Sequence, residues 1–495
     1  MRIQILRKWY LPLILLISIV PRLWRINTDL QIHFDQGLHS LSIWKIYNEG
    51  KWSFLGHQTD TDGIFHGPIY YWLMMPSYLI GKWDPAAASI FQIILDTLGV
   101  YFLFSLSKEL FSEKTALISS LIYAVSYGYI SYARWLSNVT PSLPLSILFF
   151  LILYRFHRGN VRLLPYAAAL ASLITQLDGA IGVFLYPLLL IEVILGKIWK
   201  RISPKTAFIS LVMLAAPHIP LFIFEMRHNF VITRAIVRLS VNPGQGVGLN
   251  YHVFILNLVT LFKEITNTVS FPFTWLAFLI VSFSLFNLNL SKSRQQTAFL
   301  VRSITIFFTA LSLYGRGAAG FFFIPILPLI TIIVSHAISS LPRYLSIILV
   351  SLLTIINIFH WKNFLTPSHA LTPIGTFNLI TNQDRKNVID WIYIQSAGQP
   401  FAVWIYTIPY FLDDPWVYYF SWYGKSKYGY LPEKTGGFSP SDVKTARLFY
   451  NIYEPDDNQP SKLGSWLEEV KSNFGPAEKS FRSNDAIVEQ RSWKR

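Results

Sequence analysis

Acidic residues and histidines gather in one stretch of the sequence, between two apolar segments. Six of the thirteen acidic residues among positions 1–360 lie in residues 27–85. They are Asp29, Asp35, Glu49, Asp60, Asp62 and Asp84, and the same stretch holds His33, His39, His57 and His66. Many aromatic residues accompany them, which predicts that the stretch folds against an apolar surface. A carboxylate in partly apolar surroundings has a raised proton affinity and suits a general base.

Charged residues at the ends of other apolar segments are further candidates. Arg134 and Arg316 fall on the side of the predicted membrane domain that is otherwise poor in basic residues. Such an arginine is costly unless it is paired, so each is a candidate anion-binding residue; the alternative is an arginine that reaches for lipid headgroups. Asp178 lies in the turn QLDG between two apolar helices and is expected to face a cavity. Asn138 begins a glycosylation sequon, but its place beside Arg134 favours a role in the site.

The composition is that of a membrane protein. Of 495 residues, 52% are hydrophobic and only 14% are charged, against about 25% charged in an average soluble domain. A helix that crosses a bilayer needs about 20 mostly apolar residues. Eleven such stretches occur, at 10–26, 86–107, 115–132, 140–156, 162–177, 180–196, 206–224, 272–290, 298–314, 318–336 and 343–360. Two shorter apolar runs, 67–81 and 253–262, are interpreted as interfacial or re-entrant segments.

The net charge of +15 follows the predicted loops and does not indicate a nucleic-acid partner. Residues 1–360 hold 27 basic and 13 acidic residues, whereas the remainder of the chain is nearly balanced. The basic clusters fall in alternate loops, which predicts a cytoplasmic N-terminus and, with an odd number of spans, an extracytoplasmic C-terminus. Pro21 and Arg22 follow the first apolar run where a signal peptide needs small residues, so we expect a retained helix. The chain has no cysteine, which excludes disulfides and thiolate chemistry.

Residues 361–495 change character and predict a second domain. The run FAVWIYTIPYF at 401–411 is typical of a strand, and residues 384–398 and 466–475 are typical of helices. We therefore expect a polytopic α-helical membrane domain over residues 1–360, whose first outer loop is 27–85, followed by a soluble extracytoplasmic α/β domain over residues 361–495.

Four segments resemble the GT-C glycosyltransferases of the protein-mannosyltransferase and lipid A aminoarabinose-transferase type. FDQG at 34–37 resembles the aromatic-Asp-Glu motif of their first outer loop, and HGPIYYWL at 66–73 resembles the H-P-P-L-Y-Y-like motif that follows it. ISYARWLSNVTP at 130–141 is similar to the second outer turn of related prokaryotic members, and RGAAGFFFIPILP at 316–328 is similar to their Y-F-x-P-x-L-P helix. The C-terminal domain is also similar to those attached to bacterial and archaeal members.

The resemblance implies an enzyme that moves a hexosyl or pentosyl group from a polyprenyl-phosphate donor. The acceptor would be a glycan, lipid or protein outside the cytoplasmic membrane of a prokaryote, and transfer would invert the anomeric carbon. A hydroxyl acceptor needs a base as it attacks, and Asp35 matches the family's base. Gln36 stands where relatives often have a second acid, which leaves one carboxylate in the motif.

The remaining site residues follow from the charge of a lipid-phosphate leaving group and from the family motifs. Fixed cations and donors stabilise that phosphate. The expected donor-phosphate ligands are Arg134, Arg316 and His66, and the expected sugar or acceptor contacts are Asp178, Asn138, Tyr70 and Tyr71. Relatives often show a histidine near the place of Asp178, and the two tyrosines could equally belong to an aromatic belt at the membrane interface.

A metal ion is the less favoured expectation. Asp60-Thr61-Asp62 reads as D-x-D, and carboxylate pairs suit Mg²⁺ or Mn²⁺. The oligosaccharyltransferase branch of GT-C enzymes uses such an ion, whereas the mannosyltransferase-like branch, which this chain resembles more, generally does without one. We therefore expect no cofactor and keep Asp60 and Asp62 as the alternative.

Two other functions are compatible with the hydrophobicity alone. A transporter or flippase of lipid-linked glycans is the main alternative, but the chain shows none of the paired, interrupted halves that many transporters have. A structural membrane protein would not explain why Asp35, Arg134, Asp178 and Arg316 fall on one side.

Overall fold

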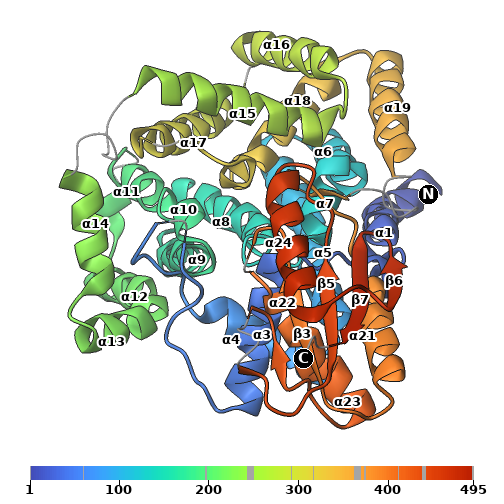
Figure 1. Cartoon of the computed structure of the whole chain (residues 1–495). Helices are drawn as coiled ribbons and strands as arrows, with labels where there is room; N and C mark the ends of the chain where they lie inside the picture. Colours follow the sequence, from blue (N-terminus) through green and yellow to red (C-terminus); the bar gives the residue numbers. More distant parts are fainter. Residues whose placement is uncertain are drawn as a thin grey trace. The chain divides into compact units, whose positions relative to one another are not determined.

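The computed structural model describes most of the chain. The described residues are 2–59, 61–195, 198–241, 250–290, 293–315, 317–361, 370–372, 375–410, 412–437 and 442–492. Figure 1 shows a helical chain that ends in a small sheet. The helices up to residue 201 are α1 (Arg2–Leu23), α2 (Ile26–Asp29), α3 (Phe34–Asn48), α4 (Ile69–Ile80), α5 (Pro85–Leu110), α6 (Glu113–Val125), α7 (Tyr127–Arg134), α8 (Ser142–His157), η1 (Val161–Leu163), α9 (Leu164–Leu177), α10 (Gly179–Gly182), α11 (Leu185–Leu195) and η2 (Ile198–Arg201).

Further helices continue to residue 360 and precede the sheet. They are α12 (Pro204–Ala215), η3 (Ala216–His218), α13 (Ile219–Arg227), α14 (Val231–Val241), α15 (Tyr251–Val269), α16 (Thr274–Leu290), α17 (Arg294–Leu313), η4 (Gly320–Phe323), α18 (Leu327–Ser340) and α19 (Arg343–His360). The C-terminal helices are α21 (Asn382–Ser396), α22 (Asp414–Tyr419), η5 (Phe420–Gly424), α23 (Lys425–Tyr428) and α24 (Pro460–Phe474). The strands are β1 (Ala370–Thr372), β2 (Gly375–Phe377), β3 (Phe401–Tyr406), β4 (Lys434–Thr435), β5 (Leu448–Tyr453), β6 (Lys479–Ser483) and β7 (Ala486–Ser492).

Fewer helices than expected are long enough to cross a membrane by themselves. Within the described ranges, four helices pass by length and composition, and the number rises to six if each of two bent pairs is one span. The four are Pro85–Leu110, Pro204–Arg227, Arg294–Leu313 and Arg343–His360. Five shorter apolar helices fall within or overlap other predicted spans: Trp9–Leu23, Ser142–His157, Val161–Leu177, Gly179–Leu195 and Leu327–Ser340. The predicted number of eleven spans is therefore not confirmed.

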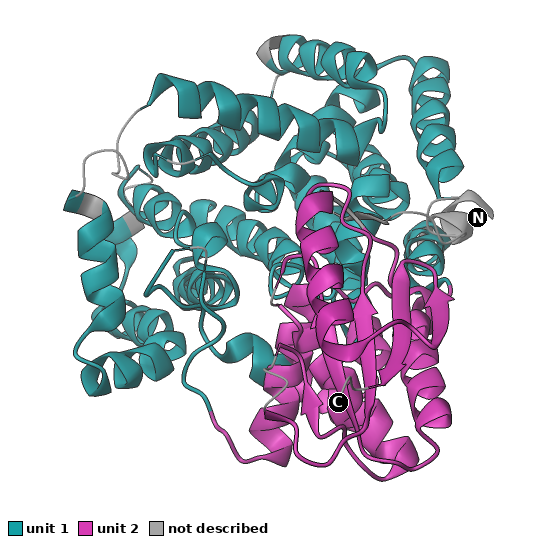
Figure 2. Ribbon diagram, viewed as in Figure 1, with its two compact units in different colours: residues 1–24, 53–73, 91–365 teal, residues 25–52, 74–90, 366–495 magenta. Residues whose placement is uncertain are grey.

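The chain forms two compact units, and their boundaries differ from a single cut near residue 360. Unit 1 comprises residues 1–24, 53–73 and 91–365, and unit 2 comprises residues 25–52, 74–90 and 366–495 (Figure 2). Unit 2 thus includes α3 and much of the predicted first outer loop. In this division α3 groups with the C-terminal segment, and the predicted boundary between a membrane domain and a soluble domain stays a prediction.

The sheet of unit 2 explains the strand and helix patterns at the end of the sequence. Its order is β4-β3-β5-β7-β6, with β3 parallel to β4 and β5, and β7 antiparallel to its neighbours β5 and β6. Successive side chains of a strand point to opposite faces. From β3, Trp404 packs against Phe474 of α24 with ring centroids 5.3 Å apart, whereas Phe401 packs against Tyr393 of α21 at 5.1 Å. The sheet is therefore covered on both faces, which matches the predicted α/β domain.

A buried ion pair fixes the first helix of unit 1. The Arg22 Nε atom of α1 lies 2.8 Å from an Asp96 carboxylate oxygen of α5, and both side chains are fully buried. Arg22 also donates to the carbonyls of Ser18 and Ala124, each at 2.9 Å, and the Tyr123 hydroxyl donates to Asp96 at 2.7 Å. Loss of one charge would leave the other buried without compensation.

Replacement of Asp96 tests this dependence. Asp96→Asn should destabilise the protein by about 3–5 kcal/mol because Arg22 stays buried without its counter-charge. The measurement is the thermal unfolding temperature in detergent. The matched control is Glu109→Gln, which removes the partner of Arg155 in a partly exposed pair at 2.6 Å and should cost about 1 kcal/mol or less. Equal shifts in the two variants would contradict the assignment.

Candidate functional site

Asp35 lies in the first turn of α3, on a capped helix start. His33 is the N-cap residue, and its backbone N–H donates to the Gln36 side chain at 2.9 Å in a reciprocal capping box. The first turn of a helix favours negative charge because its N–H groups are unsatisfied and its dipole is positive there. Gln36, which replaces the expected second acid, is buried and serves this cap. The departure from the family motif thus keeps the helix start intact.

The C-terminal segment of unit 2 holds the residues just before Asp35. The Asn382 N–H donates to the Leu30 carbonyl at 2.7 Å. The buried guanidinium of Arg385 donates to the Ile32 carbonyl through Nη2 at 2.6 Å and Nε at 3.1 Å. These contacts place the start of α3 against α21.

Gly37 of the FDQG motif is required by a close approach within unit 2. A Cβ atom at this position would lie 2.4 Å from the Pro415 side chain and 2.5 Å from its backbone. Backbone atoms do not yield as a flexible side chain does, so only glycine lets α3 pack on α22.

Burial, with a smaller effect from the positive charge of Arg385, lowers the pKa of His33 to about 3. His33 is therefore neutral beside the Asp35 carboxylate at neutral pH.

The histidine motif belongs to unit 1, where it meets the QLDG turn. The Gly67 N–H donates to the Gln176 carbonyl at 3.1 Å. A Cβ atom on Gly67 would overlap the Gln176 amide oxygen at 1.8 Å. The glycine of HGP therefore allows the loop to lie directly on the end of α9.

His66 is a buried and neutral imidazole. Its ring centroid lies 4.4 Å from that of His57. Burial lowers the pKa of His66 to about 4, and burial followed by the charge of His66 lowers that of His57 to about 3. Within the described ranges, His66 Nδ1 and Gln176 Oε1 are buried without a hydrogen-bond partner. Such atoms are costly unless a ligand or water pairs with them. Gln176 Oε1 is therefore a candidate acceptor for a substrate hydroxyl, and His66 Nδ1, in the tautomer that carries its proton there, is a candidate donor to a phosphate oxygen.

Asn138 and Asp178 lie at the same turn of unit 1. The Asn138 amide donates to the Leu177 carbonyl at 2.7 Å, and the Ile181 N–H donates to the Asp178 carboxylate at 3.1 Å as the N-cap of α10. Both side chains are buried. The structure therefore brings His66, Asn138 and Asp178 to one turn, as the sequence analysis expects of site residues.

His218 and Tyr186, which sequence reasoning missed, extend this turn through hydrogen bonds. The Gln176 side-chain nitrogen lies 2.6 Å from His218 Nδ1, and the Tyr186 hydroxyl lies 2.8 Å from His218 Nε2. His218 follows a long apolar run with no neighbouring charge, so no local pattern marks it. The network fixes the Gln176 amide from the side opposite Gly67.

The ISYARW and RGAAG motifs both contact Glu264, a buried acid that sequence reasoning also missed. Glu264 of α15 accepts a hydrogen bond from the Tyr132 hydroxyl at 3.0 Å. A Cβ atom on Gly320 would lie 2.3 Å from the Glu264 carboxylate. Tyr132 belongs to the ISYARW motif and Gly320 to the RGAAG motif. Glu264 lies in an apolar helix, and its spacing gives no sign that it joins them.

Arg134 has a structural task that the sequence did not indicate. Its Nη1 atom donates to three carbonyls at the end of α1, those of Pro21 at 3.2 Å, Arg22 at 3.1 Å and Trp24 at 2.9 Å. These are the carbonyls that a helix leaves unsatisfied at its C-terminus. This guanidinium is half-buried, and its binding to a donor phosphate through atoms other than Nη1 stays a prediction.

The other predicted site residues are placed less directly. Tyr70 and Tyr71 are buried in unit 1, with ring centroids 6.3 Å apart. Arg316 and Asp60 lie outside the described residues, and the Asp62 carboxylate accepts a hydrogen bond from Gln58 at 3.0 Å. In the part of the chain that the structure describes, no cluster of three or more metal-ligating side chains occurs. Asp35 belongs to unit 2.

Comparison with known proteins relates this geometry to a family. Residues 65–222 match the model of the dolichyl-phosphate-mannose-protein mannosyltransferase family. The matched range contains the HGPIYYWL, ISYARWLSNVTP and QLDG segments described above. A search of curated protein sequences finds no match.

The fold is similar to that of a solved structure along its whole length. Apo ArnT from Cupriavidus metallidurans aligns with a TM-score of 0.62 at 10% identity, over 99% of this chain and 98% of ArnT. ArnT bound to undecaprenyl phosphate aligns with a TM-score of 0.60 at 9% identity, over 97% of each chain. The chain therefore contains a segment that matches a mannosyltransferase family model, and its fold is similar to that of ArnT.

Proposed function

We propose that the protein transfers a sugar from a polyprenyl-phosphate donor to a hydroxyl of an extracytoplasmic glycan, lipid or protein. The observation that carries the proposal is the family match over the segments that build the His66–Gln176–Asp178 turn. The similar fold of ArnT with bound undecaprenyl phosphate supports a lipid-phosphate donor. The predicted topology, with the N-terminus in the cytoplasm of a prokaryote and unit 2 outside, places the acceptor on the outer side.

In the proposed reaction, Asp35 takes the proton of the acceptor hydroxyl as that oxygen attacks the anomeric carbon. The bond from the sugar to the donor phosphate oxygen breaks, and the configuration at the sugar inverts. The capped start of α3 fixes the backbone around Asp35 and thereby orients its carboxylate, which a general base requires. The neutral His33 beside it adds no competing positive charge.

The leaving phosphate needs donors that are in place before it develops charge. In this proposal, Arg134 and Arg316 supply positive charge, and His66 supplies an uncharged N–H group. Gln176 and Asp178 contact the hydroxyls of the sugar or acceptor. The network from Tyr186 through His218 holds the Gln176 amide for that contact.

Replacement of Asp35 tests the proposed base. Asp35→Asn should lower kcat by about 10²–10⁴-fold and leave the KM for the donor nearly unchanged, because the amide keeps the shape but takes no proton. Purified protein in lipid is incubated with radiolabelled polyprenyl-phosphate sugars and crude envelope acceptors, and transfer is counted. The control Glu49→Gln changes another acid of the same predicted loop, which pairs with the exposed Lys51, and should transfer at the wild-type rate.

The outcomes separate the base assignment from the function. Equal transfer by wild type and Asp35→Asn would remove Asp35 from the mechanism. Absence of transfer from every donor in the wild type would favour a flippase of lipid-linked glycans.

The uncharged state of His66 has a consequence for stability. Because its folded pKa is lowered to about 4, the unfolded chain binds more protons than the native protein between about pH 6.5 and pH 4. Stability should therefore fall as the pH drops through this window, by at most about 1.4 kcal/mol per pH unit for each such histidine. Thermal unfolding in detergent at pH 7 and pH 5 measures the change.

Substitution of the histidine pair provides the comparison. His57→Gln combined with His66→Gln should flatten the pH dependence, since His57 is shifted in the same direction. His228→Gln alters an exposed histidine and should leave it unchanged. A wild-type protein as stable at pH 5 as at pH 7 would contradict the burial of neutral imidazoles.

A further inference from the structure

Helix α14 is anchored directly to the end of a candidate membrane span. The span Pro204–Arg227 is followed by a reversal at Asn229 and Phe230, whose φ angles are 54° and 57°. The Glu225 carboxylate then accepts hydrogen bonds from the Ile232 and Thr233 N–H groups at 2.7 and 2.9 Å. The start of α14 is therefore held at the level where this span ends.

The exposed surface of α14 is divided between apolar and basic side chains. Ile236, Val237 and Val241 are more than half exposed, at 51%, 54% and 72%. Arg234 and Arg238 lie four residues apart, so their side chains emerge one turn above the other. Apolar residues beside a basic face are typical of a helix that lies in the interface of a membrane.

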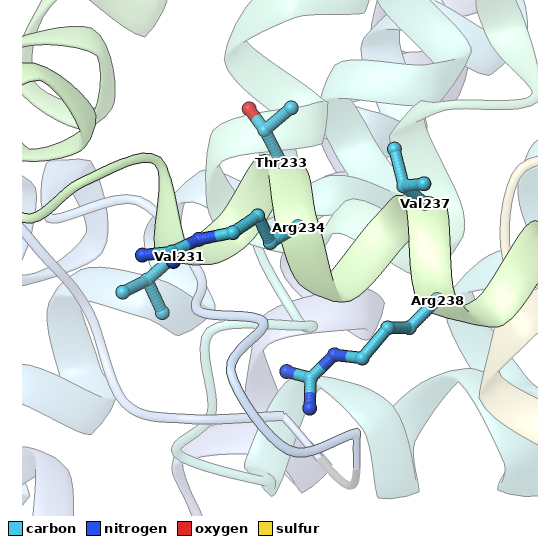
Figure 3. A pocket seen from close by; sticks show the side chains of 5 residues that line it. All are labelled: Val231, Thr233, Arg234, Val237 and Arg238. Carbon is cyan, nitrogen blue, oxygen red and sulfur yellow. The ribbon is translucent and has the colours of Figure 1, made fainter.

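A cavity of about 580 Å³ lies beside this helix, lined by Val231, Thr233, Arg234, Val237 and Arg238. Figure 3 shows Thr233 and Val237 pointing to one side of α14 in this view, whereas the guanidinium of Arg238 extends to the other. Its volume falls within the range of about 300–1,000 Å³ that is usual for ligand sites. The lining thus combines apolar surface with two guanidinium groups.

The loop that carries Gly63 bounds the same region of unit 1. A Cβ atom on Gly63 would lie 3.2 Å from Ala235 Cβ and 3.7 Å from the Arg238 guanidinium. Gly63 has a φ angle of 79°, which glycine adopts without strain. The predicted first outer loop therefore passes close to the basic face of α14.

The two arginines carry positive charge that the described protein residues do not neutralise by ion pairing. In the described part of the chain, neither Arg234 nor Arg238 forms a salt bridge. The nearby Glu225 carboxylate interacts with the charge of Arg234 without forming an ion pair, and its hydrogen bonds come from the first N–H groups of α14 and from the Thr233 hydroxyl at 2.6 Å. An anion is therefore the complementary ligand.

We propose that the α14 cavity binds one anionic phospholipid of the surrounding bilayer. The phosphate lies between Arg234 and Arg238, and the two acyl chains contact Val231 and Val237, which flank the arginines on either side of the helix. A soluble anion would leave the apolar lining unused, and an uncharged lipid would leave two guanidinium groups unpaired. A phospholipid at the end of a span satisfies both, because its phosphate and chains meet at that depth.

Native mass spectrometry of the full chain in detergent tests the proposal without any sugar donor. Phosphatidylglycerol should bind the wild type, and phosphatidylcholine should bind at least about tenfold more weakly. Arg234→Gln with Arg238→Gln should lose at least about tenfold of the phosphatidylglycerol affinity. Arg234→Lys with Arg238→Lys keeps the charge and should retain most of it.

The matched control removes two exposed arginines elsewhere, at the first residues of α17 and α19. Arg294→Gln with Arg343→Gln changes the net charge equally and should bind phosphatidylglycerol as the wild type does. An equal loss in both double glutamine variants, or no loss in either, would overturn the site.

Competition identifies the occupant independently of the proposed transfer reaction. Glycerol phosphate should not displace phosphatidylglycerol at equal concentration, since it lacks the chains. Displacement by glycerol phosphate would show a simple anion site. Stoichiometric displacement by undecaprenyl phosphate would assign the cavity to a glycosyl carrier lipid, and either result would overturn the proposal.

Discussion

The buried guanidinium of Arg385 determines where the Asp35 segment lies in unit 2. It donates two hydrogen bonds to the Ile32 carbonyl and stacks over the Trp416 ring at 4.4 Å. A charge removed from water is tolerated only when its donors and counter-charges are supplied. The nearby Glu454 is also buried, and burial raises its pKa to about 7 against the opposing effect of Arg385. A loop carbonyl, a tryptophan face and a buried acid together stabilise the guanidinium, although its Nη1 atom has no hydrogen-bond partner among the described residues.

The same constraint explains why the Asp35 helix and the C-terminal segment form one unit. A loop of residues 25–52 by itself would have no core against which to bury its aliphatic side chains, such as Ile32, Leu41 and Ile43. Its backbone pairs with α21, and α3 packs on α22 where Gly37 meets Pro415. The C-terminal segment therefore does more than extend the chain, because it forms the surface on which the proposed base is oriented.

The sequence predicts well those features that depend on local patterns. A continuous apolar run identifies β3, and helical spacing identifies α21 within two residues of its bounds and the C-terminal part of α24. The sequence also places Asp178 and Asn138 in turns between apolar helices, where they are found. It fails where a partner comes from far along the chain. The Ile32 carbonyl accepts hydrogen bonds from Arg385, and the Gly320 backbone approaches Glu264. The residues next to them in the sequence form no pattern that predicts either contact.

Arginines illustrate this difference most clearly, because composition and sequence position do not distinguish an arginine that is already paired from one that can bind a ligand. Arg134 was singled out as a cation against the expected charge distribution, yet its Nη1 atom satisfies the carbonyls at the end of α1. Arg22 lies in an apolar run and is neutralised by Asp96. No sequence pattern indicates a function for Arg234 and Arg238. The structure places both in the lining of a cavity, and neither forms an ion pair with a described residue. The location of a charge near a membrane boundary therefore does not establish its function; the groups already bound to it determine whether it can still bind a ligand.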